Sequence, residues 1–225
     1  MRALIAIGGS VKHHDWIRSE ITGAGFDLLI AADSGAVHLL DLGLRPDYLI
    51  GDLDSISDEL KMGIEKNAVE IVRLPVDKDW TDTEYSIRFA IEKGADDIVL
   101  LGSFSLARPD HLLANILRLA GLKKELPACR IRLTDGLTLA EAMVGPQVET
   151  FSLATLPRVP YIVSLFPISE TVDGVTYEGL AYPLTLAELT RGASRSISNF
   201  PIRDDLSFTV SIEAGTAVAV FTPEE

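Results

Sequence analysis

The sequence predicts a parallel-sheet α/β domain followed by a smaller antiparallel β-sandwich domain. In the first half, short apolar runs alternate with amphipathic helical patterns, which is typical of a parallel sheet covered by helices. Beyond about residue 135 the apolar residues recur with period two, which is typical of strands with one buried face. The chain has 225 residues, of which 47% are hydrophobic, enough for one large or two small domains. We place the domains at residues 1–136 and 137–225.

Six short apolar runs in the first half are the predicted strands. They show no polar alternation, as expected for strands buried on both faces of a sheet. They cover residues 3–7, 28–32, 48–50, 71–74, 98–101 and 131–133. Helices are expected between them, over residues 33–42, 57–66, 82–93 and 110–119. This alternation predicts that the strands run parallel.

The second half carries the signals of an antiparallel fold. Apolar and polar residues alternate from 206 to 212, and Ala214-Gly215 then precedes a second apolar run at 217–221. This arrangement predicts a β-hairpin. Asp173-Gly174 predicts another turn. Further strands are expected over residues 161–166 and 175–177, and the interdomain linker over residues 136–146.

The composition excludes several classes of function. The net charge of −13 and the pI of about 4.7 argue against nucleic acid and anionic membrane surfaces, which need clustered Lys and Arg. Because Cys129 is the only cysteine, disulfides within the chain and two-cysteine metal or redox sites are excluded. The N-terminal apolar run is too short for a signal peptide, and no run approaches the roughly 20 apolar residues that span a bilayer. We expect a soluble cytoplasmic protein.

Polar and glycine-rich segments follow the predicted strands of the first half. In open parallel sheets ligands bind beyond the carboxyl ends of the strands, so these segments are expected to meet at one edge of the sheet. They are Gly8-Gly9-Ser10, Asp33-Ser34-Gly35, residues 51–55, residues 77–82 and Gly102-Ser103, with residues 108–111 shortly after. Their convergence is stronger evidence for a site than any single motif.

Asp52 and Asp54 are the first candidate metal ligands. In an extended segment residues two apart point the same way, so the two carboxylates repel each other unless a cation lies between them. Mg2+ is the natural occupant, because it prefers oxygen ligands and takes substrate phosphates as further ligands. A solvated turn in which an aspartate caps a helix explains this pair equally well.

A second acidic loop precedes the third expected helix. Thr81 and Glu84 fit a capping box, which accounts for both as structural residues. A capping box does not account for the other charged residues of this loop, which together suggest a metal and phosphate site. They are Asp77, Lys78, Asp79 and Asp82.

The start of the fourth expected helix holds three further candidates. Asp110 follows Pro109 and is more typical of an N-cap than of a catalyst, and a lone histidine such as His111 is more often structural. Arg108 is the stronger candidate, since its planar guanidinium suits phosphate oxygens.

Taken in chain order, these motifs form a recognisable series. It begins with Asp33-Ser34-Gly35-Ala36, residues 42–47 and residues 51–55, and continues with residues 78–84, Arg108-Pro109-Asp110-His111 and Leu113-Ala114-Asn115. In the second half it includes residues 164–169 and 192–199. Over nearly the whole chain the series resembles that of the thiamine pyrophosphokinase family.

The resemblance implies an α/β catalytic domain that binds ATP and a sandwich domain that binds thiamine, paired as a homodimer. It implies that ATP and thiamine give AMP and thiamine diphosphate, with Mg2+ held by Asp52, Asp54 and Asp82. Candidate nucleotide-binding residues are Asp33, Ser34, Gly35, Ser55, Lys78, Thr81 and His111. Candidate thiamine-binding residues are Ser194, Ser196, Ser198 and Asn199.

For such a reaction we expect the thiamine hydroxyl to attack the β-phosphorus of ATP, with catalysis mostly by positioning and charge stabilisation. Arg108 and Lys78 would supply positive charge. Asp79 or Asp110 would accept the hydroxyl proton, and the sequence does not choose between them. Trp80 would stack on a base or on the thiazolium ring, or pack against the second domain.

The sequence departs from the family pattern in places. Ser34 and Val37 stand where the family usually has Gly and Asn, and residues 105–107 replace a usual Gly-Gly pair. Arg195 replaces a usual Leu beside the expected thiamine site, where a cation would repel the thiazolium. Two alternatives therefore stay open. One is a pyrophosphokinase for another small alcohol, and the other is a non-catalytic regulator that binds thiamine or nucleotide.

Overall fold

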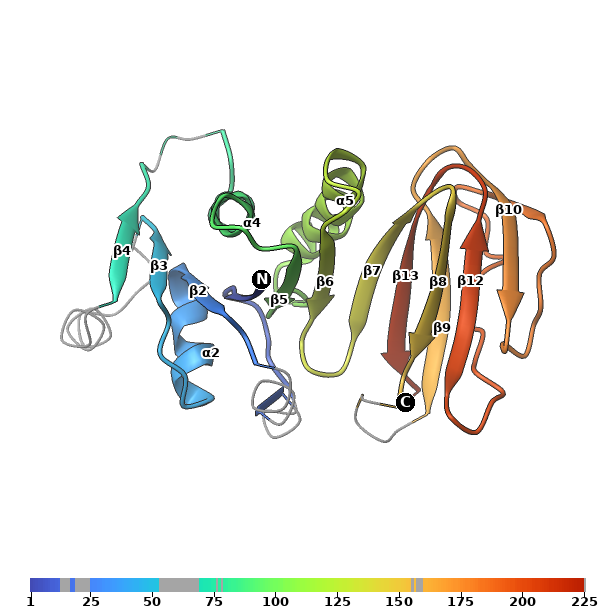
Figure 1. Cartoon of the computed structure of the whole chain (residues 1–225), viewed down its shortest axis with the longest axis horizontal. Coiled ribbons are helices and arrows are strands. Elements are labelled where there is room, and N and C mark those ends of the chain that lie inside the picture. Colours follow the sequence, from blue (N-terminus) through green and yellow to red (C-terminus); the bar gives the residue numbers. More distant parts are fainter. Residues whose placement is uncertain are drawn as a thin grey trace. The chain divides into compact units, whose positions relative to one another are not determined.

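The computed structural model describes residues 1–12, 17–18, 25–52, 69–75, 77, 79–154, 156 and 160–224. The chain forms two compact units, coloured along the sequence in Figure 1. The first comprises Met1–Arg108 and Cys129–Gly136, and the second Pro109–Ala128 and Leu137–Glu225. The helix predicted at residues 57–66, and Asp54, Ser55 and Lys78 of the predicted site, lie outside the described residues.

The first unit is built on a parallel sheet. Its strand order is β4-β3-β2-β1-β5-β6, and every neighbouring pair runs parallel. Each strand matches its predicted range to within one residue at either end, so the predicted parallel sheet is confirmed. The strands are β1 (Arg2–Ala6), β2 (Leu28–Ala32), β3 (Tyr48–Gly51), β4 (Glu70–Arg73), β5 (Asp97–Leu101) and β6 (Arg130–Thr134).

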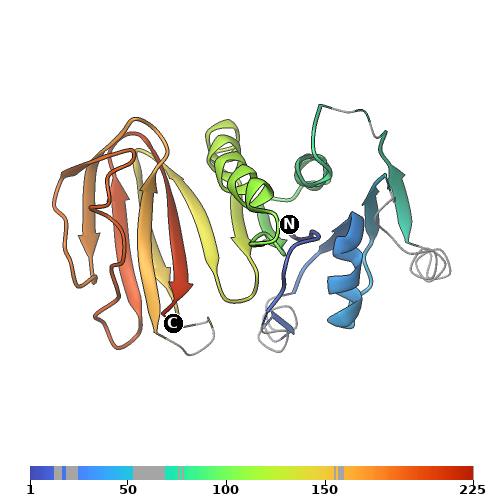
Figure 2. The ribbon, with the colours of Figure 1, turned by 180° about the vertical axis from the view of Figure 1, so that it is seen from behind.

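Both faces of the central strands are buried. Leu4 of β1 packs in a cluster with Leu39, whereas Ile5, the next residue, points to the opposite face and is equally buried. A short 3-10 turn, η1 (Asp33–Gly35), leads into α2 (Ala36–Asp41), which packs beside β1 and β2 (Figure 2). On these two elements the helix predicted at residues 33–42 is confirmed.

α4 (Asp82–Glu92) follows β4 and packs against β1, β2 and β3. Its predicted start is confirmed, because Thr81 Oγ1 accepts a hydrogen bond of 3.2 Å from the Glu84 N–H. One turn further on, Arg88 Nε donates to Glu84 Oε1 at 3.1 Å. The Glu84 carboxylate is therefore engaged within the helix.

α5 (Pro109–Glu125) begins one residue before the helix predicted at 110–119 and continues six residues beyond its predicted end. Proline is well suited to the first helical position, where its missing N–H costs no hydrogen bond. α5 contacts β7 and β13, so it belongs to the second unit. The boundary at residues 136 and 137 between two functionally different domains stays a prediction. Among the described residues, no helix is both long and apolar enough to cross a membrane.

The second unit is an antiparallel sandwich. β7, β13 and β9 pair in that order, and β11, β10, β12 and β8 form the facing sheet. The Phe221 ring lies 4.9 Å from that of Phe151 and 5.7 Å from that of Phe208, so aromatic side chains join the two sheets. The strands are β7 (Leu139–Val144), β8 (Gln147–Ser152), β9 (Tyr161–Pro167), β10 (Thr171–Glu178), β11 (Ala187–Thr190), β12 (Ser207–Ile212) and β13 (Thr216–Pro223).

The hairpin predicted around Ala214-Gly215 is wrong. β12 pairs with β10 and β8, whereas β13 pairs with β7 and β9, so the turn carries the chain from one sheet to the other. The two strands meet through side chains, Phe208 against Phe221, and not through backbone hydrogen bonds. Alternation shows which residues face inward but does not say which backbone they pair with.

Two further predictions in this half are also wrong. Asp173-Gly174 is not a turn between strands but lies inside β10, where the register shifts and Gly174 has φ 65°. An extra residue of this kind forms a β-bulge, for which glycine is favoured. The linker predicted at residues 136–146 is mostly β7, whose Ala140 and Ala142 are buried in the sandwich.

Tyr177 of β10 is predicted to be less stabilising than phenylalanine. It is 6% exposed, and its hydroxyl has no hydrogen-bond partner among the described residues. Burial raises the pKa of Tyr177 well above its ordinary value, in keeping with an apolar environment. Because a buried unpaired hydroxyl is costly, Tyr177→Phe should increase the free energy of unfolding by about 1 kcal/mol in urea denaturation.

Tyr161→Phe is the matched control. The hydroxyl of Tyr161, a residue that is 5% exposed, donates to Leu137 O at 3.1 Å. Its removal should lower the free energy of unfolding by about 1 kcal/mol. Equal destabilisation by both substitutions would contradict this account of Tyr177.

Candidate active site

Glycines let the backbone close tightly at the carboxyl edge of the parallel sheet. A β-carbon on Gly35 would overlap the carbonyl oxygen of Ala6, and one on Gly9 would overlap that of Gly102. The loops after β1, β2 and β5 therefore touch through their backbones, and only glycine fits at these contacts. Gly35, a predicted nucleotide-binding residue, lies inside this arrangement, which we call the glycine rim (Gly9, Gly35 and Gly102).

Asp33 places its carboxylate against the end of the neighbouring strand. A β-carbon on Gly51, the last residue of β3, would overlap the Asp33 carboxylate. Asp33 itself has φ 47°, a left-handed conformation that few residues other than glycine adopt, and such strain is often found at functional sites. Asp52 follows Gly51 directly, so the two predicted site residues lie at adjacent strand ends. The Ser34 side chain lies beside Gly8 of the loop after β1.

Asp82 is the first residue of α4. The helix returns the chain from the end of β4 to the start of β5, so its N-terminus lies at the carboxyl edge of the sheet. One oxygen of the Asp82 carboxylate and one of the Asp33 carboxylate are fully buried. The Thr81 side-chain oxygen accepts the hydrogen bond that caps α4, so Thr81 has a structural role.

The ligand chemistry of this edge fits magnesium, which prefers hard oxygen ligands. Asp33 directly follows β2, Asp52 directly follows β3 and Asp82 begins α4, so all three carboxylates belong to segments at this edge. Within the part of the chain that the structure describes, no three acidic, histidine or cysteine side chains lie close enough to share an ion. Asp54, the remaining predicted ligand, lies outside the described residues.

The predicted residues around Arg108 are exposed. Arg108 ends the first unit, after a turn in which its N–H donates to Ser105 O at 3.3 Å. Leu106, which stands where a glycine was expected, is 89% exposed. Asp110 and His111 lie in the first turn of α5, where Asp110 Oδ2 is 3.8 Å from His111 Nε2.

The predicted thiamine segment contains two kinds of residue. Ser196 and Asn199 are 4% and 5% exposed and bond to backbone: Ser196 Oγ donates to Leu165 O at 2.6 Å. Asn199 accepts at Oδ1 from the N–H groups of Tyr182 and Phe200 at 2.9 and 3.0 Å, and Nδ2 donates to Tyr182 O at 2.8 Å. These two side chains therefore fix the segment to β9 and to residue 182.

The other residues of that segment face outward. Ser194, Arg195 and Ser198 are exposed, and Ile197 is 40% exposed. The Ser198 N–H bonds to Ser164 Oγ at 3.2 Å, with Ser198 at φ 63°. Of the four predicted thiamine-binding residues, only Ser194 and Ser198 present their side chains at the surface.

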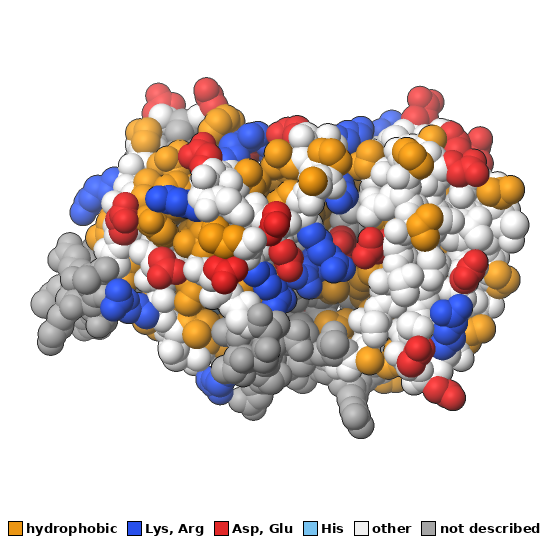
Figure 3. All heavy atoms as spheres, in the orientation of Figure 1, with side chains coloured by type: hydrophobic (Ala, Val, Ile, Leu, Met, Phe, Trp, Pro, Cys, Tyr) orange, Lys and Arg blue, Asp and Glu red, His pale blue; other side chains and the backbone are white. Residues whose placement is uncertain are grey.

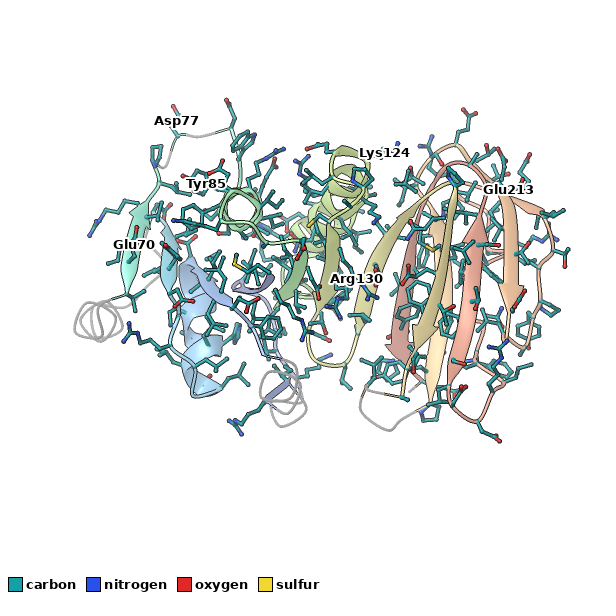
Figure 4. All side chains as sticks on the ribbon, in the orientation of Figure 1. Glu70, Asp77, Tyr85, Lys124, Arg130 and Glu213 are labelled. Carbon is teal, nitrogen blue, oxygen red and sulfur yellow. The ribbon has the colours of Figure 1, made fainter. Side chains whose placement is uncertain are left out.

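Sequence reasoning missed a pocket beside the start of α4. It has a volume of about 370 Å³ and is lined by Leu74, Pro75, Asp79, Trp80 and Tyr85. Figure 4 labels Tyr85 on α4 and Asp77 on the loop before it, with the Asp77 side chain turned away from the sheet. Asp79 and Trp80 were named from the sequence. Tyr85 was not, although its spacing of four from Phe89 was a signal that the rings share a helix face.

The comparisons with known proteins agree in both units. The catalytic domain of thiamin pyrophosphokinase matches residues 24–131, and its vitamin B1 binding domain matches residues 155–216. A thiamine pyrophosphokinase of Bacillus subtilis is 35% identical over 173 residues, which cover 76% of this chain and 77% of the relative.

Solved structures show the same architecture along the whole chain. The crystal structure of thiamine pyrophosphokinase from Bacillus subtilis superposes with a TM-score of 0.84 at 28% identity and covers 100% of both chains. That of thiamin pyrophosphokinase from Geobacillus thermodenitrificans gives 0.80 at 27% identity, covering 100% of this chain and 99% of the other.

A parallel α/β unit joined to an antiparallel sandwich is the architecture shared with these solved pyrophosphokinases, which places the chain in the class of two-unit transferases of the kinase type. With both domains matched and the relative covered over three quarters of its length, the particular family follows. The chain belongs to the thiamin pyrophosphokinase family.

Asn199 is predicted to be a structural residue of the second unit. Asn199→Ala removes three hydrogen bonds of a buried side chain and leaves backbone groups of Tyr182 and Phe200 unpaired. The free energy of unfolding should fall by about 3 kcal/mol in chemical denaturation. Ser194→Ala, at an exposed position of the same segment, should change it by less than about 0.5 kcal/mol. Equal stability of the two variants would contradict this role.

Proposed function

We propose that this protein is a thiamine diphosphokinase, which transfers the diphosphate of ATP to the thiamine hydroxyl and releases AMP. The observation that carries the proposal is the carboxyl edge of the parallel sheet. Asp33, Asp52 and Asp82 follow or begin elements that end or start at this edge, which also carries the glycine rim, and the chain has the family's vitamin B1 binding domain. Glycine-lined strand ends suit phosphates, because backbone N–H groups can approach them closely.

Asp52, Asp54 and Asp82 are the proposed magnesium ligands. When bound, the ion would neutralise charge on the phosphate oxygens of ATP. The backbone fixes where two of these carboxylates lie, because Asp82 is the first residue of α4 and Asp52 directly follows β3. The fit rests on their all-oxygen chemistry.

Residues around the rim would bind and orient the nucleotide. Asp33, Ser34 and Gly35 form the turn after β2, beside the backbone of the loop after β1. Lys78 and Arg108 would counter the phosphate charge, with Arg108 suited to paired oxygens. The remaining proposed nucleotide contacts are Ser55, Thr81 and His111, of which Thr81 also caps α4.

Proton removal from the thiamine hydroxyl needs one carboxylate. Asp79 and Asp110 are both exposed, as a residue that meets an incoming hydroxyl must be. Little covalent chemistry falls to the protein in phosphoryl transfer, so positioning of the two substrates would contribute most of the rate.

Thiamine would bind at the segment of residues 194–199. Ser194 and Ser198 would contact it directly, while Ser196 and Asn199 hold the segment in place. The net charge of −13 attracts the fixed positive charge of thiamine. A homodimer is proposed from the resemblance to the family. A cytoplasmic location stays a prediction from the sequence.

The direct test mixes the purified protein with thiamine, ATP and magnesium and follows products by mass spectrometry. We expect AMP and thiamine diphosphate in equal amounts. Formation of ADP and thiamine monophosphate would exclude diphosphate transfer in favour of ordinary phosphoryl transfer. No product at all while both ligands bind would exclude the proposal and favour a non-catalytic binding protein.

Removing a proposed metal ligand should abolish turnover without unfolding the protein. Asp54→Asn and Asp52→Asn keep the side-chain size but lose the negative charge, so kcat should fall by about 10²- to 10³-fold. Asp41→Asn, at the exposed end of α2, is the matched control and should keep full activity. Ordinary turnover by Asp54→Asn, with a native circular dichroism spectrum, would refute the metal assignment.

Arg195 tests which alcohol is the acceptor. Its exposed guanidinium lies in the proposed thiamine segment, where it would repel a thiazolium. Arg195→Leu should therefore lower the KM for thiamine by several-fold and leave the KM for ATP unchanged, as measured by initial rates. A higher KM for thiamine in this variant would contradict the expected repulsion. A large loss of activity of Arg195→Leu toward an alcohol that carries negative charge, with thiamine a poor substrate of the wild type, would favour a negatively charged acceptor.

A further inference from the structure

The pocket beside α4 is an apolar slot with one acidic group at its wall. Leu74, Pro75, Trp80 and Tyr85 supply its apolar and aromatic lining, and Asp79 is the charged residue among the described lining residues. Its volume of about 370 Å³ is enough for a bicyclic heteroaromatic ring. Figure 3 shows apolar side chains gathered on the surface over α4 and β4, at the upper left of the view.

Both aromatic walls are held in place by neighbours. The Arg88 guanidinium lies 4.7 Å from the centre of the Trp80 ring, and Glu84 binds Arg88 through contacts of 3.1 Å. Tyr85 stacks on Phe89 with ring centres 6.5 Å apart and planes inclined by 21°. Walls that are already fixed lose little side-chain entropy when a flat ligand enters, which favours binding.

Trp80 is nevertheless 46% exposed, a large fraction for a tryptophan whose position is fixed. Arg88 lies over the ring, while the pocket uses the same ring as a wall. Stacking between an aromatic side chain and a nucleic base is favourable for any base, because every base has a flat π-surface. The pocket therefore offers a stacking surface for a neutral heteroaromatic ring.

Asp79 adds a preference among such rings. A carboxylate only accepts hydrogen bonds, so it favours a ring with an exocyclic amino group and disfavours a carbonyl at the same place. At C6 adenine carries an amino group and guanine a carbonyl. Guanine also has an amino group, at C2, so the preference for adenine holds for a base that turns its C6 edge toward Asp79. We propose that this pocket binds the adenine base of the nucleotide, with Trp80 and Tyr85 as stacking walls and Asp79 as the acceptor for the adenine amino group. The inference rests on the proposed function and names the base-binding part of its site.

The position of the pocket suits a nucleotide whose phosphates lie at the rim. Trp80 precedes Asp82 by two residues, a backbone reach of about 7 Å. A base held at Trp80 would thus place its phosphates near the start of α4. Thiamine is the poorer occupant, because the Arg88 cation already lies over Trp80 and would oppose a second cation there. With Asp79 committed to the base, Asp110 is left as the proton acceptor.

The first experiment measures stacking with AMP as the probe, by isothermal titration calorimetry, and the KM for ATP by initial rates. Trp80→Ala should raise both the Kd for AMP and the KM for ATP by at least tenfold, since loss of one base–aromatic stack typically costs that much. Trp80→Phe keeps a ring and should restore most of the affinity. The KM for thiamine should change less than twofold in both variants.

The second experiment measures the choice of base. Asp79→Asn introduces an amide that can donate to a guanine carbonyl, so the ratio of kcat/KM for ATP to that for GTP should fall by about tenfold. Asp41→Asn is the matched control, because it removes the same charge from an exposed position at the end of α2, outside the proposed site. It should leave that ratio unchanged.

The two proposals fail in different ways. If the wild-type protein makes no thiamine diphosphate, the proposed function fails, while AMP binding still tests the pocket. If Trp80→Ala binds AMP as tightly as the wild type, the adenine assignment is wrong even in an active enzyme. A raised KM for thiamine with an unchanged KM for ATP would overturn it as well and place the acceptor in the pocket.

Discussion

The close approach of backbone segments at the carboxyl edge of the parallel sheet is the constraint on which the first unit depends. Gly9, Gly35 and Gly102 make it possible, because a single β-carbon at any of them would overlap a neighbouring atom. Beside these contacts the Asp33 carboxylate lies against Gly51 at the end of β3, directly before Asp52. The acidic edge is thus a consequence of glycine packing as much as of acidic residues.

The second unit is held together by side-chain packing between its two sheets. Its two sheets are joined by the rings of Phe151, Phe208 and Phe221, so its stability comes from an aromatic core. The buried side chain of Asn199 makes hydrogen bonds to backbone groups and so fixes the segment. Ser194 and Ser198 of the same segment are exposed. Within this short motif, some residues therefore fix the backbone and others are available to contact a substrate.

The parallel strands could be predicted from the sequence because continuous apolar runs are required wherever both faces of a sheet are buried. The sandwich strands could be recognised by alternation, but their partners could not. β12 alternates and the apolar run of β13 follows it after a turn signal, as in a hairpin, yet Gly215 turns the chain into the opposite sheet. Likewise, the motif at 196–199 identified a segment but not the inward direction of Ser196 and Asn199. The pocket at Trp80 could not be predicted, because its lining comes from both the segment after β4 and the start of α4, and no local sequence pattern shows that these lie together.

The central claim is that carboxylates from separate loops hold one divalent ion against the phosphates of ATP. It is tested most directly by electron paramagnetic resonance of Mn2+ titrated into the protein with ATP, comparing the wild type with Asp52→Asn, Asp82→Asn and Asp41→Asn. The account predicts that the first two substitutions each weaken Mn2+ binding by at least tenfold, whereas Asp41→Asn leaves it unchanged. Equal Mn2+ affinity in all four proteins would contradict it.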